Sequence, residues 1–577
     1  MSSFFALVAF CALPLVLADA IHVSVPSTPP SNHIVQPNFL GISFELSFVS
    51  EYFGNDTTTI PQPFVNYLST LRNRIGNQPL RMRLGGNSMD DSLYVPTQTT
   101  PMLQLISGDF NFDDQPVHYG PVLWDVLATV ATNIGGAAYL IGHDFLGSAT
   151  QRLGDSLDGF LLGNEPDLYT AHGNRPHIKN YTTAIYIDEF RTSSDHLTNT
   201  TAGNILSKHD LGGPTICCDW NLDALLDDGY TSAFGDILKY ISLQHYPQNN
   251  CFGFNKYKIS YYVQHSNVVE LASWQGAGVK KVVSNRINNQ QLIMSEFNSA
   301  SCGGIPGLSD TFAVGSLWTI DYALQLASVG YSAAYLHTRE RGISYNLFTP
   351  PPGPNGAPGL WTTNPPFYSL LVTAEALRSQ NGSIVSDLNI NGSRTNPNVK
   401  YSGYAVYDAG DSTVQQLVFF NFANVSSSLN STALFDVPSG VFNATSGKNV
   451  VVKYLVGNSM QEKKNIAWGG QTFANAGNGE LVSAGNASWA VPDAQLDCTN
   501  GCTVQVPAPG MAVVFAGGLP PKTSSTSTTL LSTSSTPSTS ATADVNTSSA
   551  AVRLTSVPSR IFPIIVSIVV TIIVATL

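Results

Sequence analysis

Short apolar runs alternate with longer helical patterns between residues 38 and 374, and this alternation is typical of repeated β/α units. Eight of the apolar runs have the length of a strand: Leu40–Phe44, Leu80–Leu84, Ala137–Ile141, Gly159–Leu162, Pro214–Cys218, Tyr240–Gln244, Gln291–Ser295 and Ser332–Leu336. Helical patterns lie between most of them, at residues 63–75, 121–132, 182–197, 261–277 and 312–328. Eight β/α repeats predict an α/β fold of the (β/α)8 TIM-barrel type, whose active sites gather where the strands end.

The pattern changes after residue 375. The apolar runs Tyr401–Tyr407, Val414–Phe420, Val450–Leu455 and Ala512–Phe515 are separated by Gly, Asn and Ser turns, with no long helical pattern between them. The sequence therefore predicts a C-terminal β-sandwich over residues 375–517. An early run at residues 21–26 precedes the barrel, and the second domain is discontinuous if that run supplies one of its strands.

Both ends of the chain carry targeting patterns. Residues 1–20 hold an apolar stretch followed by Ala18-Asp19-Ala20, which is typical of a signal peptide with its cleavage site. Residues 522–549 are almost wholly Ser, Thr, Pro and Ala and predict an O-glycosylated stalk. Residues 550–577 join small residues, a polar spacer and an apolar tail, as a glycosylphosphatidylinositol (GPI) attachment signal does. The alternative for this segment is a tail-anchored transmembrane helix.

These patterns predict a secreted glycoprotein, anchored by a lipid to the plasma membrane or the cell wall. Ten Asn-x-Ser/Thr sequons agree with secretion. Six cysteines remain once Cys11 is removed with the signal peptide, an even number that predicts disulfides. Cys498 and Cys502 are close enough to form one disulfide, while the pairing of Cys217, Cys218, Cys251 and Cys302 stays open.

Charge and motifs exclude several classes of function. The net charge of −12 and the charged content of 11% argue against nucleic acid as a partner. The cysteine spacings fit no zinc pattern, and no dinucleotide or phosphate-binding motif is present, so we expect neither metal nor cofactor. The oligomeric state stays undetermined.

Two glutamates carry the candidate chemistry. Glu165 follows the fourth apolar run, in Asn164-Glu165-Pro166, and Glu296 follows the seventh. A single Glu after a strand is usually a solvated loop residue. Two carboxylates on the rim of one barrel can instead cleave a glycosidic bond, one as the acid and the other as nucleophile or base. The sequence therefore predicts a glycosidase. For the case in which the second carboxylate is the nucleophile, we expect the two carboxyl groups to lie about 5–5.5 Å apart.

Further polar and aromatic residues follow the predicted strands and predict a carbohydrate cleft beside the two glutamates. They are Glu45, Arg83, Asn87, His143, Asp144, Asn164, Asp219, Trp220, His245, Tyr246, His337 and Arg339. We expect Asn164 to bind the sugar 2-hydroxyl, an interaction that strengthens in the transition state of glycoside cleavage. His143, Asp144 and His245 are candidates for binding other hydroxyls.

Three motifs resemble glycoside hydrolase family 79 over residues 20–517. They are Gly163-Asn164-Glu165-Pro166-Asp167-Leu168-Tyr169, Ser295-Glu296-Phe297-Asn298 and Arg83-Leu84-Gly85-Gly86-Asn87. The resemblance implies a barrel with a C-terminal β-sandwich, a retaining mechanism, Glu165 as acid/base and Glu296 as nucleophile. It also implies that Tyr246 hydrogen-bonds the nucleophile, and the overall organisation is similar to fungal members of the family.

The resemblance further implies a β-glucuronidase, with uronate-binding groups after the seventh and eighth strands. This indicates residues 299–304 and 339–345, where Arg339, Arg341 and Tyr345 have suitable chemistry. Exo-β-glucuronidase action on glucuronic-acid-bearing glycans is the leading hypothesis. An endo-β-glucuronidase of heparanase type, another β-glycosidase of the same clan, and a non-catalytic carbohydrate-binding protein of the cell wall are the alternatives.

Overall fold

The computed structural model describes residues 20–106, 115–142, 146–200, 202–208, 210–253, 255–284, 290–355, 357–424 and 432–519. The predicted signal peptide up to residue 19, the stalk and the anchor signal lie outside the described residues. No helix in the described part of the chain combines the length and the apolar character that a membrane span requires.

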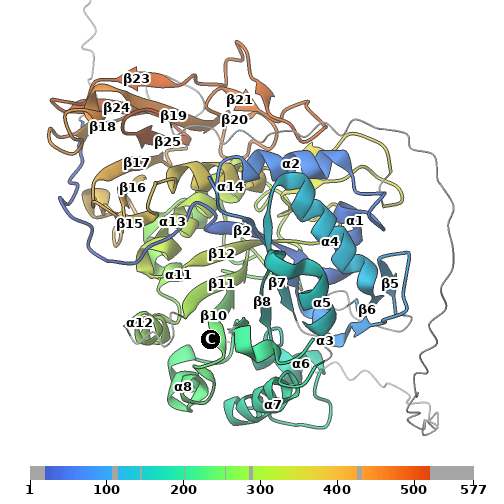
Figure 1. Cartoon of the computed structure of the whole chain (residues 1–577). Coiled ribbons are helices and arrows are strands. Elements are labelled where there is room, and N and C mark those ends of the chain that lie inside the picture. The colour runs from blue at the N-terminus through green and yellow to red at the C-terminus, as the bar shows by residue number, and fades with distance from the viewer. Residues whose placement is uncertain are drawn as a thin grey trace, which may run out of the picture. The chain divides into compact units, whose positions relative to one another are not determined.

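A closed barrel of eight parallel strands forms the first part of the described chain (Figure 1). Its strands are β2 (Leu40–Glu45), β3 (Leu80–Gly85), β7 (Ala137–Gly142), β8 (Leu157–Leu161), β9 (Leu211–Ile216), β10 (Leu238–His245), β11 (Gln291–Phe297) and β12 (Ala333–Thr338). β12 pairs with β2 and closes the barrel. Each predicted run matches one of these strands, because parallel strands covered on both faces are continuous apolar segments.

Side chains fill the interior of the barrel, and helices surround it. Leu140, Leu161, Tyr240, Ile293 and Tyr335 form a buried cluster contributed by five different strands. The surrounding helices include α2 (Gln62–Arg72), α4 (Pro121–Ile134) and α7 (Thr183–His196), close to their predicted bounds. Between β3 and α4 lies a small sheet that the sequence pattern did not predict, formed by β4 (Leu93–Tyr94), β5 (Leu103–Leu105) and β6 (Val117–Tyr119).

Two predicted helices differ from the observed ones. The segment predicted as one helix at 261–277 is divided into α10 (Ile259–Tyr262), α11 (His265–Ala272) and α12 (Gly276–Ser284). The backbone is extended at Gln264 and left-handed at Gln275, where φ is 60°, and neither conformation can continue a helix.

The helix predicted at 312–328 begins with a π-helical segment, Phe312–Trp318, and continues as α13 (Thr319–Val329). Within the π-helical segment, Gly315 lies against Pro366 of α14 (Pro365–Ala376), where a Cβ would come within 2.8 Å of the proline ring. The close contact between these two helices therefore requires glycine at this position.

The C-terminal part is a β domain of two packed sheets. The larger sheet contains β15 (Ser383–Asp387), β16 (Tyr401–Asp408), β17 (Val414–Asn421), β19 (Val450–Gly457), β20 (Ile466–Trp468), β21 (Gln471–Thr472), β22 (Val482–Ser483), β23 (Ala494–Leu496) and β25 (Gly510–Phe515). The smaller sheet contains β1 (Ile21–His22), β18 (Ala433–Val437) and β24 (Cys502–Val506). The rings of Phe419 and Phe435 stack between the sheets with centroids 4.6 Å apart. The β domain thus includes a strand from the start of the described chain.

A buried ionic network joins the barrel to the β domain, which lies beside α13 and α14 in Figure 1. His265 of α11 has one ring nitrogen 3.0 Å from Asp321 of α13 and the other 3.2 Å from Asp387 of β15. The Tyr404 hydroxyl of β16 donates to Asp321 at 2.7 Å, and Arg394 contacts Asp387 at 2.7 Å. Burial alone would lower the pKa of His265, but the two carboxylates outweigh it and raise this pKa to about 10.

The charge on His265 stabilises the contact between the two parts, and we predict a pH-dependent loss when it is removed. Because the folded pKa exceeds the unfolded value, the stabilisation is complete below about pH 6.5 and is lost between about pH 6.5 and 10. His265→Ala should lower the free energy of unfolding by about 3–5 kcal/mol at neutral pH. The measurement is the unfolding midpoint of both proteins from pH 6 to 10, where the difference should shrink as the pH rises.

The matched control is His22→Gln, because the side chain of His22 is 91% exposed. It should leave the midpoint unchanged at every pH. A difference between His265→Ala and the wild type that stays constant up to pH 10 would contradict the assignment of a charged His265.

Candidate active site

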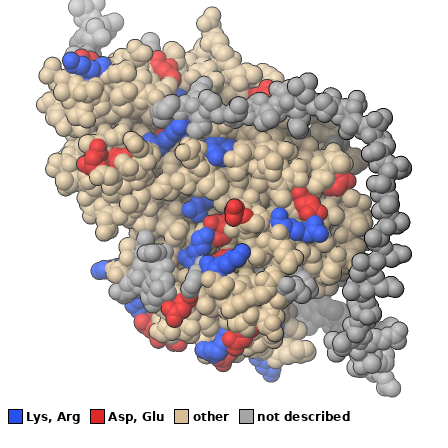
Figure 2. Space-filling model, viewed as in Figure 1, with Lys and Arg blue, Asp and Glu red and all other residues tan. Residues whose placement is uncertain are grey.

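A cavity of about 440 Å³ lies at the carboxyl ends of the barrel strands. Its walls include residues at or after six of those strands: Glu45, Asn87, Glu165, Tyr246, Glu296 and His337. The volume falls in the range of small-molecule sites. On the face shown in Figure 2, side chains of both charges cluster near the middle, whereas wide areas around them carry none. The cavity therefore brings both predicted catalytic glutamates together with several of the predicted binding residues.

Glu296 is held by three side chains that favour its charged form. Arg83 donates to one carboxylate oxygen at 2.5 Å and Tyr246 donates to the other at 2.8 Å. His337 lies 3.7 Å from the oxygen that Arg83 contacts. Burial alone would raise the pKa of Glu296, but the charges of His337 and Arg83 and the Tyr246 hydrogen bond outweigh it and lower this pKa. Glu296 is thus a carboxylate.

Glu165 has the opposite electrostatic surroundings. Its backbone is left-handed, with φ 46°, directly before the short helix Pro166–Leu168. Burial raises the pKa of Glu165 well above its usual value, and the negative charges of Glu296 and Asp167 raise it further. The side-chain amide of Gln244 lies between two neighbours, 2.9 Å from Oδ1 of Asn164 and 3.0 Å from Oε1 of Glu165. The surroundings of Glu165 thus favour its protonated form, whereas those of Glu296 favour the charged form.

Arg83 connects the two catalytic strands. Its guanidinium binds Glu296 and also donates to Oδ1 of Asn164 at 2.8 Å. Asn164 donates in turn to Oδ1 of Asn87 at 2.8 Å. The sequence identified Arg83 as a strand-end residue but not as the residue that binds Glu296. The signal for it was a pair of charged side chains, Arg81 and Arg83, inside the otherwise apolar second barrel segment, Leu80–Gly85.

The remaining predicted binding residues are placed as follows. Tyr345 and Arg339 line the cavity, as do Ser301 and Cys302 of the segment 299–304. Arg341 does not line it, and its backbone N–H donates to Glu51 at 2.6 Å. His143 and Asp144 lie outside the described residues.

The structure does not bring His245 to the cavity. Its imidazole stacks on Trp274 with ring centroids 4.4 Å apart, and burial lowers its pKa to about 4. Side chains of a strand alternate between its two faces, so His245 at the end of β10 points away from the face used by Gln244.

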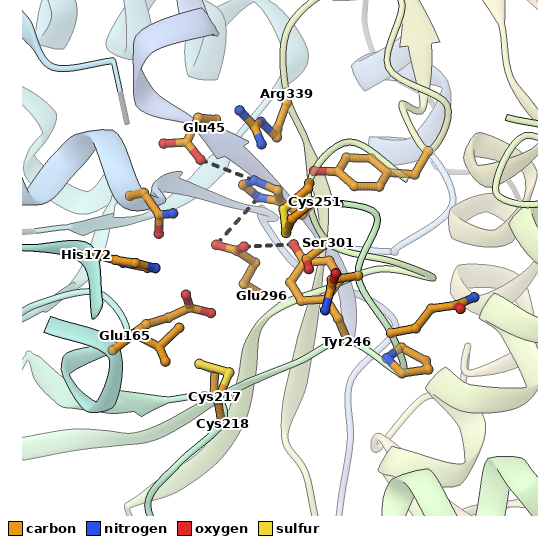
Figure 3. Close-up of a pocket in the computed structure, with 18 residues that line it drawn as sticks. Glu45, Glu165, His172, Cys217, Cys218, Tyr246, Cys251, Glu296, Ser301 and Arg339 are labelled. Atoms are coloured by element: carbon orange, nitrogen blue, oxygen red, sulfur yellow. Dashed lines mark hydrogen bonds and ion pairs between the residues drawn. A yellow bond between two sulfur atoms is a disulfide. The ribbon is translucent and has the colours of Figure 1, made fainter. Parts of the chain in front are cut away.

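All six described cysteines form disulfides. Cys498 and Cys502 are joined in the β domain, as the sequence predicted. The open pairing is resolved as Cys217–Cys218, between adjacent residues, and Cys251–Cys302. All four of these cysteines line the cavity (Figure 3). Among the described residues, no group of three or more His, Cys, Asp or Glu side chains could hold a metal ion.

Comparison with known proteins identifies relatives of the chain. Residues 403–513 match the profile of the glycosyl hydrolase family 79 C-terminal beta domain. A beta-glucuronidase of Neurospora crassa is 24% identical over 527 residues, which cover 81% of this chain and 89% of that relative.

Solved structures share the fold. A 4-O-alpha-L-rhamnosyl-beta-D-glucuronidase from Fusarium oxysporum has a TM-score of 0.68 at 19% identity, covering 86% of this chain and 100% of its own. A GH51 arabinofuranosidase from Xanthomonas axonopodis pv. citri has a TM-score of 0.53 at 12% identity, covering 86% of this chain and 99% of its own.

The chain is a glycosidase built from a TIM barrel and a C-terminal β domain. Residues 403–513 of that β domain match the C-terminal β domain of glycoside hydrolase family 79, so the resemblance to this family that the motifs indicate is confirmed.

We predict that Arg83→Gln lowers kcat roughly 10²-fold, because the carboxylate of Glu296 loses a charged, buried hydrogen-bond donor. Without that charge the pKa of Glu296 rises, so the acidic limb of the pH profile of kcat/KM should move to higher pH. The measurement is the pH–rate profile on an aryl glycoside.

Arg83→Lys is the matched control, because it keeps the charge but loses the two-armed geometry. Its acidic limb should stay close to that of the wild type even where kcat falls. An unshifted limb in Arg83→Gln would show that Arg83 does not tune the nucleophile.

Proposed function

We propose that the protein is a retaining exo-β-glucuronidase that acts on glucuronic-acid-bearing glycans. The observation that supports it most is the pair Glu165 and Glu296 in one cavity, with the pKa of the first raised and that of the second lowered. In retaining glycoside hydrolysis, the carboxyl group with the raised pKa serves as the acid, and the one with the lowered pKa serves as the nucleophile.

In the proposed mechanism, Glu296 attacks the anomeric carbon while Glu165 donates its proton to the leaving oxygen. The proton loss lets Glu165 act as the base in the second step, in which it deprotonates the water that releases the sugar from Glu296. Tyr246 and Arg83 hold the attacking carboxylate in place between the steps. Asn164, which hydrogen-bonds Arg83 and Asn87, is the residue that we assign to the 2-hydroxyl of the sugar.

The glucuronide is proposed on two grounds. The similar proteins from Neurospora and Fusarium are named as glucuronidases. The cavity also carries Arg339, His337 and the Tyr345 hydroxyl, which suit a uronate carboxylate. Exo action is proposed because a cavity of about 440 Å³ suits the end of a glycan better than the interior of a long one.

We predict that an aryl β-glucuronide is turned over faster than the matching β-glucoside and β-galactoside, and that soluble polymeric glucuronides release only terminal sugar. Glu296→Ala should lower kcat by roughly 10⁴-fold or more, because the nucleophile is lost. Glu165→Ala should lower it by about 10²–10⁴-fold. Azide should restore part of the Glu165→Ala rate on a substrate with a good leaving group, since only the second step then lacks its base.

The product anomer, observed by NMR early in the reaction, tests the mechanism. Release of the β-anomer supports retention, and release of the α-anomer would exclude the covalent intermediate on Glu296. Near-normal activity of Glu296→Ala would remove the nucleophile assignment. Binding of glucuronides without turnover by the wild type would favour the non-catalytic alternative, and internal cleavage of the polymers would favour endo action.

We further propose that the protein is exported and held at the cell surface by a GPI anchor attached near Ser548 or Ser549. The order of small residues, polar spacer and apolar tail supports the anchor. The three disulfides of the described residues are also typical of an oxidising compartment.

We predict that phosphatidylinositol-specific phospholipase C releases the activity from intact cells whose anchors lack inositol acylation. A variant in which Ser548, Ser549, Ala550 and Ala551 are all replaced by large residues should lose the cell-bound fraction, because attachment needs small side chains. Peptides from residues 561–577 found in the mature protein by mass spectrometry would instead indicate a retained transmembrane helix.

A further inference from the structure

The wall of the cavity contains a disulfide between adjacent residues, Cys217 and Cys218, directly after β9. Such a disulfide closes a small ring with the peptide bond between the two residues, so its outer face is stiff and lacks strong hydrogen-bond donors. Cys217 is buried and Cys218 is exposed to the cavity side. Sulfur is polarizable and makes favourable contacts with apolar and aromatic groups.

The position of this disulfide relative to the catalytic pair indicates what it faces. In Figure 3, Glu45 and Arg339 lie on one side of Glu296, and the Cys217–Cys218 disulfide lies on the opposite side, next to Glu165. The acid must stand beside the oxygen of the leaving group in order to protonate it. The side of the cavity that holds Glu165 and the disulfide is therefore the side of the leaving group. Leu168 adds a further apolar side chain to the wall of the same cavity.

Asp167 fixes the disulfide in place relative to the acid. Its carboxylate accepts hydrogen bonds from the backbone N–H groups of Cys217 at 3.2 Å, Cys218 at 2.7 Å and Asp219 at 2.8 Å. Asp167 is itself buried and follows Glu165 by two residues. The loop that carries the acid and the loop that carries the disulfide are thus joined as one rigid unit.

We infer that the Cys217–Cys218 disulfide is the apolar wall of the leaving-group subsite and selects aglycones that present an aryl ring or another apolar face. The inference rests on the proposed function in one respect, the role of Glu165 as the acid. It adds a specificity-determining element that acts on the aglycone and leaves the choice of sugar to the opposite side of the cavity.

The test compares phenyl and methyl β-glycosides of the same sugar on the wild type and on Cys217→Ser/Cys218→Ser. The variant should lose about threefold to tenfold in kcat/KM on the phenyl glycoside, chiefly through KM, and less than twofold on the methyl glycoside. Cys498→Ser/Cys502→Ser, which removes a disulfide of the β domain, is the matched control and should change neither value.

An equal loss on both glycosides would show that the disulfide only supports the fold, and no loss would show that it does not contact the aglycone. Either result overturns the inference. The kcat/KM values of the phenyl and methyl glycosides are compared on whichever sugar the wild type hydrolyses. A preference for a sugar other than glucuronate would therefore refute the proposed substrate, and the role of the disulfide would still be tested.

A binding measurement on the wild type covers the case in which the variant does not fold. Phenyl 1-thio-β-glucuronide should slow the phosphine reduction of Cys217–Cys218, followed by mass spectrometry of alkylated peptides, and should leave the reduction of Cys498–Cys502 unchanged. The methyl thioglycoside should give less protection at equal site occupancy. Equal protection by the two thioglycosides, or none by the phenyl compound, would overturn the inference.

Discussion

The buried guanidinium of Arg83 is the group on which the geometry of the active site depends. It binds Ser43 of β2, Asn164 after β8 and Glu296 of β11, and so ties three separate strands to one cation. A charge with only 1% exposure is costly to bury unless it is paired and hydrogen-bonded. The ion pair with Glu296 offsets that cost and, in the same contact, favours the charged form of the Glu296 carboxyl group. Arg83 therefore both positions the carboxylate of Glu296 and stabilises its charge.

Burial and the charges around Glu165 and Glu296 together shift the pKa values of these two residues in opposite directions. Glu296 is surrounded by Arg83, His337 and the Tyr246 hydroxyl, whereas Glu165 meets other carboxylates and apolar burial. Two residues of one chemical type thus acquire two protonation states within one cavity. Most of the neighbours that cause the difference come from other strands, and the exception is Asp167, which follows Glu165 by two residues.

The fold was more predictable from the sequence than the site. All eight barrel strands follow from continuous apolar runs, because burial on both faces leaves a local pattern. The break at Gln275 was missed, since a single left-handed residue that is not glycine leaves no such pattern.

Glu165 and Glu296 could be identified because they end strands of a barrel. The role of Arg83 and the contacts of Asp167 depend on partners that are distant in sequence, which no local pattern encodes. The pairing of the adjacent residues Cys217 and Cys218 stayed open because four cysteines can pair in three ways. The prediction that His245 faces the cavity was wrong. Its place at the end of a barrel strand fixes where the residue lies along the strand, but not the face of the strand from which its side chain projects.

The pairing of β1 with β18 has a consequence for how the protein is made. Ile21 lies beside Phe435, so β1 cannot pair until the whole barrel and β18 have been synthesised. The entropic cost of closing so large a loop grows only slowly with its length. The pairing of β1 with β18 can therefore form once the barrel between them has folded. Until β1 is in place, β18 presents an open edge, which is the kind of surface that draws strands from other molecules. Loss of Ile21 and His22 would remove β1 and leave that edge of β18 unpaired in the finished protein.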